Sequence, residues 1–287
     1  MKRTVGLSLG LGYLNEEYFK KMKDSGVDAV EISCASADYE KLDYRAIQQA
    51  ADRTGIILWS FHYPFSPFDK LNLASLDENV RRASVAYLSE LTRKASDIGI
   101  KRFVVHASGE PIAEENRAES LRVARESIAE LAVVAKECGA VIAVEDLPRT
   151  CLGNCHGDIL ALIGDDPTLG VCFDSNHLTA ERGEDFLAAV GHRLITVHIS
   201  DFDFINERHW LPGEGKIDWT SMMQALDATG YDGVFLYELS FVSTKTIERK
   251  RPLEPSDFAK NAAELAAGKH PTPVDTPYPD LGMWGRK

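Results

Sequence analysis

The stretch VIAVEDLPRTCLGNCHGDILALIGDDPTLGVCFDS (141–175) decides the fold, because it holds two short apolar runs separated by a longer polar and helix-like segment. The two runs, 141–147 and 169–175, are rich in Val, Ile, Leu and Phe, as buried strands are. Parallel strands need a crossover connection of a dozen or more residues, usually a helix. The stretch therefore predicts one strand–helix–strand unit.

The same unit repeats along the whole chain. Short apolar runs alternate with longer segments of helical period, several of which end in Gly at the expected C-cap. There are eight such runs: TVGLSLG (4–10), DAVEISC (28–34), IILWSFHY (56–63), RFVVHAS (102–108), VIAVEDL (141–147), LGVCFDS (169–175), LITVHIS (194–200) and GVFLYELS (233–240). Eight units without a G-x-G-x-x-G turn fit a closed barrel better than an open sheet. We therefore predict an α/β protein with a single (β/α)₈ TIM barrel over residues 1–267, followed by an irregular, proline-rich tail at 268–287.

Composition and charge restrict the function classes. The chain has 287 residues, of which 44% are hydrophobic and 26% charged, as in a globular chain that can build a large core. A net charge of −12 argues against affinity gained by neutralising many phosphates, although bound divalent ions would reduce that charge. The first residues contain only a short, Gly-interrupted apolar run, which fits neither a signal peptide nor a membrane span. We expect a cytoplasmic protein with no membrane partner, and nucleic acid is not the expected partner.

Ionisable side chains interrupt the apolar runs near their carboxyl ends, which is where TIM barrels carry their chemistry. One such residue would be an ordinary hydrogen-bonded group, but seven of the eight runs have one: Glu31, His62, His106, Glu145, Asp174, His198 and Glu238. Burying so many carboxylates and imidazoles in one mouth is costly unless a cation compensates them. The pattern predicts a divalent metal site. Mixed His and carboxylate ligands suit zinc, manganese, iron or cobalt, and suit magnesium less.

Further polar residues follow these runs. Arg149 comes shortly after Glu145, and it either binds a substrate carboxylate or phosphate or pairs with a neighbouring acid. The segment ERHWLPGEG (207–215) places Trp210 and a Gly-rich turn after the seventh run, as expected of a lid over the mouth. Aromatic residues in the loops, among them Phe65 and Phe68, fit either a closed pocket for a small polyol or ordinary packing at the top of a barrel.

Five motifs occur in order on the expected strands: VEDLP, FDSNHL, VHISD, RHWLPGEG and LYELS. Together they resemble the xylose isomerase-like barrels, the superfamily that joins sugar isomerases and epimerases with endonuclease IV. The resemblance covers most of residues 1–267. It implies one divalent ion (Mn, Co, Zn or Mg) held by Glu145, Asp174, His198 and Glu238.

The resemblance to the sugar enzymes also implies roles in catalysis. Glu145 and Glu238 would remove and return a proton beside the carbonyl of a small keto-sugar or inosose. His177 would hydrogen-bond a substrate oxygen, and Arg208 would stabilise a developing enediolate. Epimerisation, isomerisation and elimination by a lyase remain open, and a homo-oligomer is expected from the resemblance alone.

Endonuclease IV offers an alternative, a phosphoesterase that acts on abasic DNA with up to three zinc ions. The resemblance to it extends to His62, His106, His177 and His209, and to Glu207 where an Asp is expected. Against it, the segment from Trp59 to Leu76 has one basic residue, Lys70, and Glu31 resembles the sugar isomerases. A sugar-binding protein without catalysis is a third alternative, and the presence of both Glu145 and Glu238 argues against it.

Overall fold

The computed structural model of the chain describes residues 3–286. Eight parallel strands form one sheet in the order β7-β6-β5-β4-β3-β2-β1-β8. The two outermost strands, β7 and β8, meet through a parallel bridge between Ile199 and Tyr237, where the Ile199 amide donates to the carbonyl of Leu236. The sheet therefore closes on itself, and the predicted (β/α)₈ barrel is confirmed.

Each predicted apolar run contains one strand. The strands of the barrel are β1 (Val5–Leu9), β2 (Ala29–Ile32), β3 (Ile57–His62), β4 (Arg102–Val105), β5 (Val141–Glu145), β6 (Leu169–Asp174), β7 (Leu194–His198) and β8 (Phe235–Tyr237). Most of their residues are buried on both faces, because side chains fill the barrel interior and helices cover its outside. This double burial explains why the runs are continuous in apolar residues rather than alternating.

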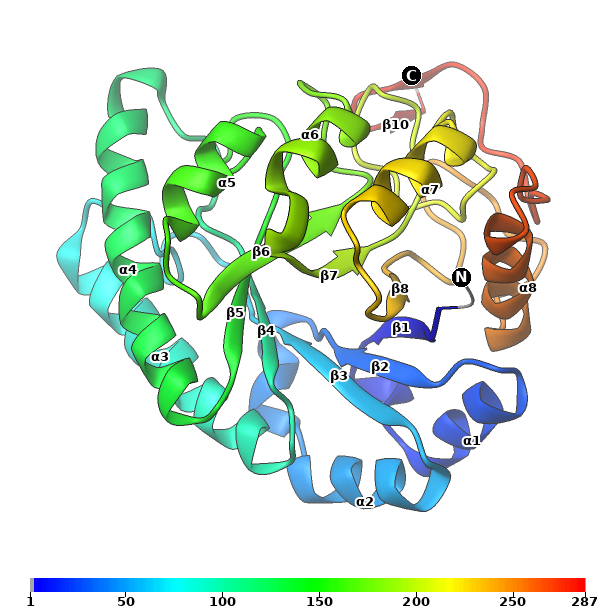
Figure 1. The fold of residues 1–287 in the computed structure, drawn as a ribbon, viewed down its shortest axis with the longest axis horizontal. Helices are drawn as coiled ribbons and strands as arrows, with labels where there is room; N and C mark the ends of the chain where they lie inside the picture. The colour runs from blue at the N-terminus through cyan, green and yellow to red at the C-terminus, as the bar shows by residue number, and fades with distance from the viewer. Residues whose placement is uncertain (1–2, 287) are drawn as a thin grey trace.

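Eight α-helices surround the strands (Figure 1). They are α1 (Glu16–Asp24), α2 (Tyr44–Thr54), α3 (Glu78–Asp97), α4 (Arg117–Glu137), α5 (His156–Ile163), α6 (Gly183–Val190), α7 (Trp219–Ala228) and α8 (Pro255–Ala266). Short 3₁₀ turns occur at η1 (Leu11–Tyr13), η2 (Ser36–Lys41), η3 (Glu114–Asn116) and η4 (Gly191–Arg193). Within residues 3–286, every helix is too short or too polar to cross a bilayer.

Short polar side chains fix where several helices begin. Asn15 accepts a hydrogen bond from a first-turn amide of α1, and Asp43, Asp77 and Asp218 do the same for α2, α3 and α7. Gly55 ends α2 with a φ of 71°, a left-handed conformation that glycine adopts without a Cβ penalty. These local signals set the helices between the strands in the order that the sequence predicts.

A long loop follows β7 and is organised around one buried carboxylate. Asp201 is fully buried and accepts hydrogen bonds from the amides of Phe202, Gly213 and Ile217 and from the Trp219 indole, at 2.8–3.1 Å. Hydrogen bonds to this one carboxylate thus hold together the loop between β7 and α7, most of which has no regular secondary structure. The same segment carries Glu207 and His209.

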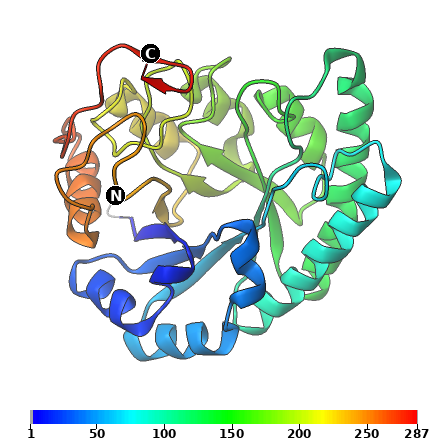
Figure 2. The same ribbon diagram turned by 180° about the vertical axis from the view of Figure 1, so that it is seen from behind.

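The described part of the tail, 268–286, returns to the carboxyl end of the barrel. It contains a short antiparallel pair, β9 (Leu281–Gly282) and β10 (Gly285–Arg286), in a segment for which the sequence predicts only irregular structure. This hairpin lies beside the loop that follows β7, as both views of the ribbon show (Figure 1, Figure 2). Residues 281–286 therefore lie close to the mouth of the barrel.

Candidate metal centre

Four side chains expected to bind a metal meet at the carboxyl ends of neighbouring strands. Glu145, Asp174 and His198 are the last residues of β5, β6 and β7, and Glu238 directly follows β8. One ligand atom from each lies within 4.8 Å of all the others, and the first three side chains are fully buried. The barrel thus brings together residues that are up to 93 positions apart in the sequence.

His198 lies at the centre of this group. Its Nδ1 is 2.8 Å from Oε1 of Glu145 and 3.1 Å from Oε2 of Glu238. Its Nε2 is 3.0 Å from Oε1 of Glu31. The Glu31 carboxylate also accepts hydrogen bonds from the hydroxyl of Ser8 on Oε1 and from that of Ser60 on Oε2. Glu31 therefore lies behind His198 and orients the imidazole toward the other carboxylates, as outer carboxylates do at metal sites.

The residues fit a divalent cation. Oδ2 of Asp174 is buried without a hydrogen-bond partner, whereas Oδ1 accepts from the Asn176 amide at 2.7 Å. Burial raises the pKa of Asp174 to about 6, and the neighbouring carboxylates of Glu145 and Glu238 add to that rise. An unpartnered oxygen beside two further carboxylates and one imidazole is the environment that a bound cation would stabilise.

Glu31 provides a direct test of this arrangement. Glu31→Gln is expected to weaken metal affinity by about 10-fold to 100-fold, because the amide no longer holds Nε2 of His198 as a charged acceptor does. Titration of the metal-free protein with Mn²⁺ or Zn²⁺ by calorimetry measures the change. Glu17→Gln on the exposed face of α1 is the matched control. Equal affinities in the two variants would contradict the orienting role of Glu31.

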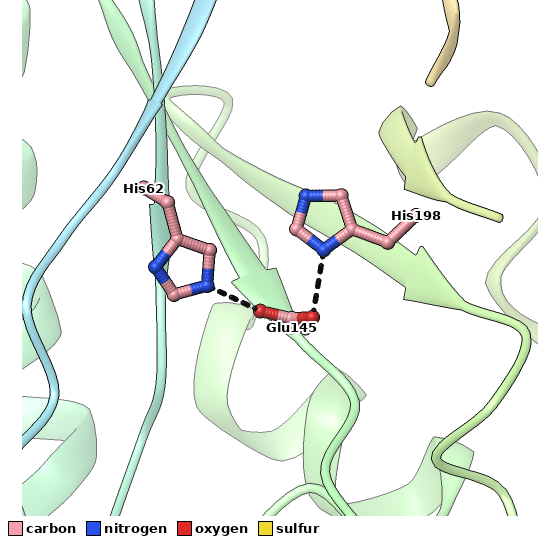
Figure 3. Close-up of side chains that lie close together, drawn as sticks. All are labelled: His62, Glu145 and His198. Atoms are coloured by element: carbon pink, nitrogen blue, oxygen red, sulfur yellow. Dashed lines mark hydrogen bonds and ion pairs between the residues drawn. The ribbon is translucent and has the colours of Figure 1, made fainter. Parts of the chain in front are cut away.

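In a second candidate ligand group, Glu145 lies between His62 and His198, with one oxygen facing each ring (Figure 3). Nε2 of His62 and Nε2 of His106 each lie 3.1 Å from Oε2 of Glu145. Burial lowers the pKa of His62, but the hydrogen bond and charge of Glu145 outweigh it and raise that pKa to about 9. For His106 burial prevails, and its pKa falls below the ordinary value. With His198, three imidazole nitrogens therefore lie within 3.1 Å of Glu145, and Nδ1 of His177 lies 3.7 Å from its Oε1.

A third group lies nearer the mouth of the barrel. Nε2 of His177 is 3.3 Å and Nε2 of His209 is 3.9 Å from Oε2 of Glu207. Burial raises the pKa of Glu207, yet its hydrogen bond and charge interactions with His177 lower that pKa to about 2. One ligand atom from each of these three residues lies within 4.8 Å of the others, so they form a further candidate cation site.

Three of the histidines are oriented in the same way. Nδ1 of His62, His177 and His209 lies 2.8, 2.8 and 3.2 Å from the main-chain carbonyls of Tyr63, Asp146 and Glu238. A carbonyl oxygen only accepts, so each Nδ1 carries a hydrogen and each Nε2 faces a carboxylate. Metal-binding histidines commonly have their second nitrogen fixed by such a hydrogen bond.

A cavity of about 380 Å³ lies over these groups. This volume is at the small end of the range for ligand sites, about 300–1,000 Å³. Phe65 and Phe68 form one side, and the Phe65 ring stacks on His106 with centroids 4.3 Å apart. The other lining residues are His62, His106, Ser108, Glu110, Leu147, Pro148, Arg149, Cys151, His177, Glu207, His209 and Glu238.

Two expected site residues lie elsewhere in the structure. The buried guanidinium of Arg208 donates to Oδ2 of Asp203 and to the carbonyls of Gly282 and Met283, so these groups satisfy it. Trp210 is buried, and its Nε1 donates to Oγ1 of Thr246 at 3.0 Å. Among residues 3–286, neither side chain belongs to the cavity lining. Trp210 therefore packs as a fixed part of the loop after β7, and its burial does not fit the expected lid.

Arg149 does lie in the cavity lining, and its partners distinguish the two roles expected of it. Its guanidinium donates to Glu110 at 2.9 Å, to Glu207 at 2.6 Å and to Oδ1 of Asn206 at 2.7 Å. The observed interaction is therefore pairing with neighbouring acids.

Sequence reasoning missed two acidic residues near the site. Glu110 follows β4 in the segment SGEP and lines the cavity, a position at a strand end that could have marked it. Asp146, next to Glu145, is fully buried and accepts a hydrogen bond from the Asp174 amide at 2.7 Å. Burial raises the pKa of Asp146 well above its ordinary value. Asp146 thus positions the backbone that carries the candidate ligand Asp174.

Comparisons with known proteins agree with the geometry. The chain is 28% identical over 229 residues to an uncharacterized protein of Methanocaldococcus jannaschii, covering 76% of this chain and 77% of that one. It is 25% identical over 238 residues to the D-psicose 3-epimerase of Enterocloster bolteae, covering 78% and 76%. It is 24% identical over 233 residues to the L-ribulose-5-phosphate 3-epimerase of Shigella flexneri, covering 78% and 81%.

Solved structures share the fold. A 3-keto-D-glucoside 4-epimerase from E. coli superposes with a TM-score of 0.74 at 18% identity, covering 93% of this chain and all of that one. A D-tagatose 3-epimerase-like protein gives 0.72 at 24% identity, covering 91% and 95%. The family model of the xylose isomerase-like TIM barrel matches residues 19–260. This match spans most of the barrel and all four residues of the first ligand group, so the chain belongs to the xylose isomerase-like TIM barrel family, whose relatives here include sugar epimerases.

Proposed function

We propose that the protein is a metal-dependent epimerase or isomerase that abstracts a proton next to the carbonyl of a small keto-sugar or inosose. One observation carries the proposal. Glu145, Asp174, His198 and Glu238 gather their donor atoms within 4.8 Å beneath a cavity of about 380 Å³. The relatives named as psicose and ribulose-5-phosphate 3-epimerases support a sugar substrate.

The proposed reaction needs both a bound divalent ion and ionised carboxylates. A divalent ion held by the four residues would polarise the substrate carbonyl and lower the pKa of the adjacent C–H bond. Burial raises the pKa of Glu145 and of Glu238, but the charge and hydrogen bond of His198 outweigh it and hold both pKa values well below the ordinary value, so both carboxylates are ionised at neutral pH.

Glu145 and Glu238 are then the acid–base pair. One carboxylate takes the proton from one face of the sugar carbon, and the other, after it has taken up a proton from solvent, delivers that proton to the opposite face. Release of the first proton to solvent returns both carboxylates to their ionised state. His177 would hydrogen-bond a substrate oxygen through Nε2, because Nδ1 already donates to the carbonyl of Asp146. Phe65 and Phe68 would exclude water from the reacting carbon.

Isotope exchange tests the proposal. The metal-loaded protein is incubated in deuterated water with D-fructose, D-psicose, D-tagatose, inososes and 3-keto-sugars, and NMR follows deuterium at the carbon beside the carbonyl. Incorporation with at least one of these substrates, and its loss after chelation of the metal, is expected. No incorporation with any of them would contradict the proposal.

Glu238→Gln is expected to lower the exchange rate by at least about 100-fold, since an amide neither accepts nor returns the proton. Exchange per unit of bound metal is the quantity to compare, because Glu238 is also a candidate ligand. Glu137→Gln, exposed at the end of α4, is the matched control. If Glu238→Gln exchanged as fast as the wild type, Glu238 would have no part in proton transfer.

A second candidate function, hydrolysis of phosphoesters at abasic DNA, is favoured by the two additional ligand groups. His62, Glu145 and His198 form one, and His177, Glu207 and His209 the other. Metal analysis separates the candidates, because the sugar enzyme needs one tightly held ion per chain and the phosphoesterase up to three zinc ions. Cleavage of an abasic duplex without any sugar exchange would favour the second candidate.

A further inference from the structure

The C-terminal hairpin is fixed to the barrel mouth through its main chain. Arg208 donates to the carbonyls of Gly282 and Met283 at 2.8 and 3.0 Å, and Nδ2 of Asn206 donates to the carbonyl of Met283 at 2.9 Å. Arg208 is itself held by Oδ2 of Asp203 at 2.9 Å. The match to the family model ends at residue 260, so the hairpin lies outside the matched region.

The hairpin places Trp284 at the rim of the cavity. The guanidinium carbon of Arg149 is 5.5 Å from the centroid of the Trp284 ring, and Arg149 lines the cavity. Trp284 is 70% exposed, in contrast to the buried Trp210 and Trp219. The Arg149 side chain therefore lies between the cavity and the large, exposed ring of Trp284.

The charges at this rim favour a neutral ligand. Arg149 is paired with both Glu110 and Glu207, so two carboxylates surround one guanidinium. A phosphate or carboxylate on the substrate would have to displace one of these carboxylates from Arg149. Hydroxyl groups, in contrast, can donate to Glu110, whose side chain remains partly exposed.

A sugar ring has the chemistry that matches these groups. Its C–H groups pack on the electron-rich face of an indole, and its hydroxyls hydrogen-bond to neighbouring carboxylates. Resting on the proposed function, we propose that Trp284, Arg149 and Glu110 form a second sugar subsite, and that the substrate is an uncharged glycoside. Its keto-sugar ring occupies the cavity and its second ring packs on Trp284.

Kinetics with one-ring and two-ring probes test the subsite. D-Fructose is compared with isomaltulose, maltulose and leucrose, which are fructose units carrying one glucosyl group, and with D-fructose 6-phosphate. The wild type is expected to exchange at least one glucosyl-fructose with a kcat/KM about fivefold to tenfold above that of D-fructose, and the phosphate ester below it. In Trp284→Ala, the kcat/KM for the glucosyl-fructose is expected to fall close to that for D-fructose, so that their ratio is near one. Trp284→Phe is expected to keep part of the wild-type preference for the glucosyl-fructose.

Met283→Ala is the matched control, because Met283 is also exposed on the hairpin and the variant keeps the carbonyl that anchors it. This variant should retain the wild-type ratio. An unchanged ratio in Trp284→Ala, an equal loss in both variants, or a wild-type preference for D-fructose or its phosphate would overturn the subsite.

Binding distinguishes a failure of the subsite from a failure of the proposed function. Titration of the metal-loaded protein with isomaltulose and with D-fructose, followed by isothermal titration calorimetry, requires no turnover and no signal from Trp284 itself. Tighter binding of isomaltulose that is lost in Trp284→Ala supports the subsite even if no ketose exchanges its proton. Exchange of ketoses without such binding leaves the proposed function intact and overturns the subsite.

Discussion

Glu145→Gln is expected to abolish proton exchange into every active ketose and to remove the bound metal. Glu145 has one oxygen 2.8 Å from Nδ1 of His198 and the other 3.1 Å from Nε2 of both His62 and His106. Its replacement removes a candidate metal ligand, the proposed proton carrier and the carboxylate partner of three imidazoles at once. A fall in exchange rate of at least about 1,000-fold follows, since acid–base catalysis alone contributes about 100-fold to 10,000-fold.

Exchange by NMR and metal content by atomic absorption measure the two effects. Glu119→Gln, on the exposed ion-paired face of α4, is the matched control and should behave as the wild type. Circular dichroism shows whether each variant is folded. A folded Glu145→Gln variant that keeps both its metal and its exchange activity would rule out the site proposed here.

Gly215→Ala is expected to lower the free energy of unfolding by about 3 kcal/mol or more. A Cβ at this position would lie 2.2 Å from Oδ1 of Asp201 and 2.5 Å from the carbonyl oxygen of Phe202. Neither atom can move freely, because Asp201 accepts the hydrogen bonds that organise the loop after β7. The same loop carries Glu207 and His209, so the cavity is expected to lose its shape as well.

Thermal unfolding measures the effect, with a decrease of about 6 °C or more expected for a chain of this size. Gly10→Ala is the matched control, because Gly10 has a φ of −79° and a Cβ there would meet only the carbonyl of Ser33, at 3.7 Å. Equal stability of the two variants would show that the loop relaxes around the added methyl group.

The barrel could be predicted from the sequence because its strands are buried on both faces. Continuous apolar runs such as 141–147 and 169–175 show this burial directly, and Gly and Asx residues mark several helix ends. The candidate ligands could be predicted for a related reason. A carboxylate or imidazole that ends an apolar strand, as Asp174 and His198 do, must lie at the carboxyl mouth of a parallel barrel.

The loops could not be predicted in the same way, because their contacts join residues that are far apart in the sequence. Arg208 was expected at the substrate, but its charge is satisfied by Asp203 and by the main chain some 75 residues later. Trp210 was expected over the mouth, but the turn organised by Asp201 buries it. The choice between roles for Arg149 likewise depends on Glu110, which lies 39 residues earlier.

The hairpin at the mouth has a consequence for how this barrel can diversify. Its anchors, Arg208 and Asn206, bind carbonyl oxygens, which every amino acid supplies. The side chains at positions 283 and 284 can therefore change without loosening the attachment. With Trp284 in the proposed subsite, natural variation or library mutagenesis at position 284 would alter which compounds are accepted while the candidate ligands at the strand ends stay constant, so recognition and chemistry could evolve separately.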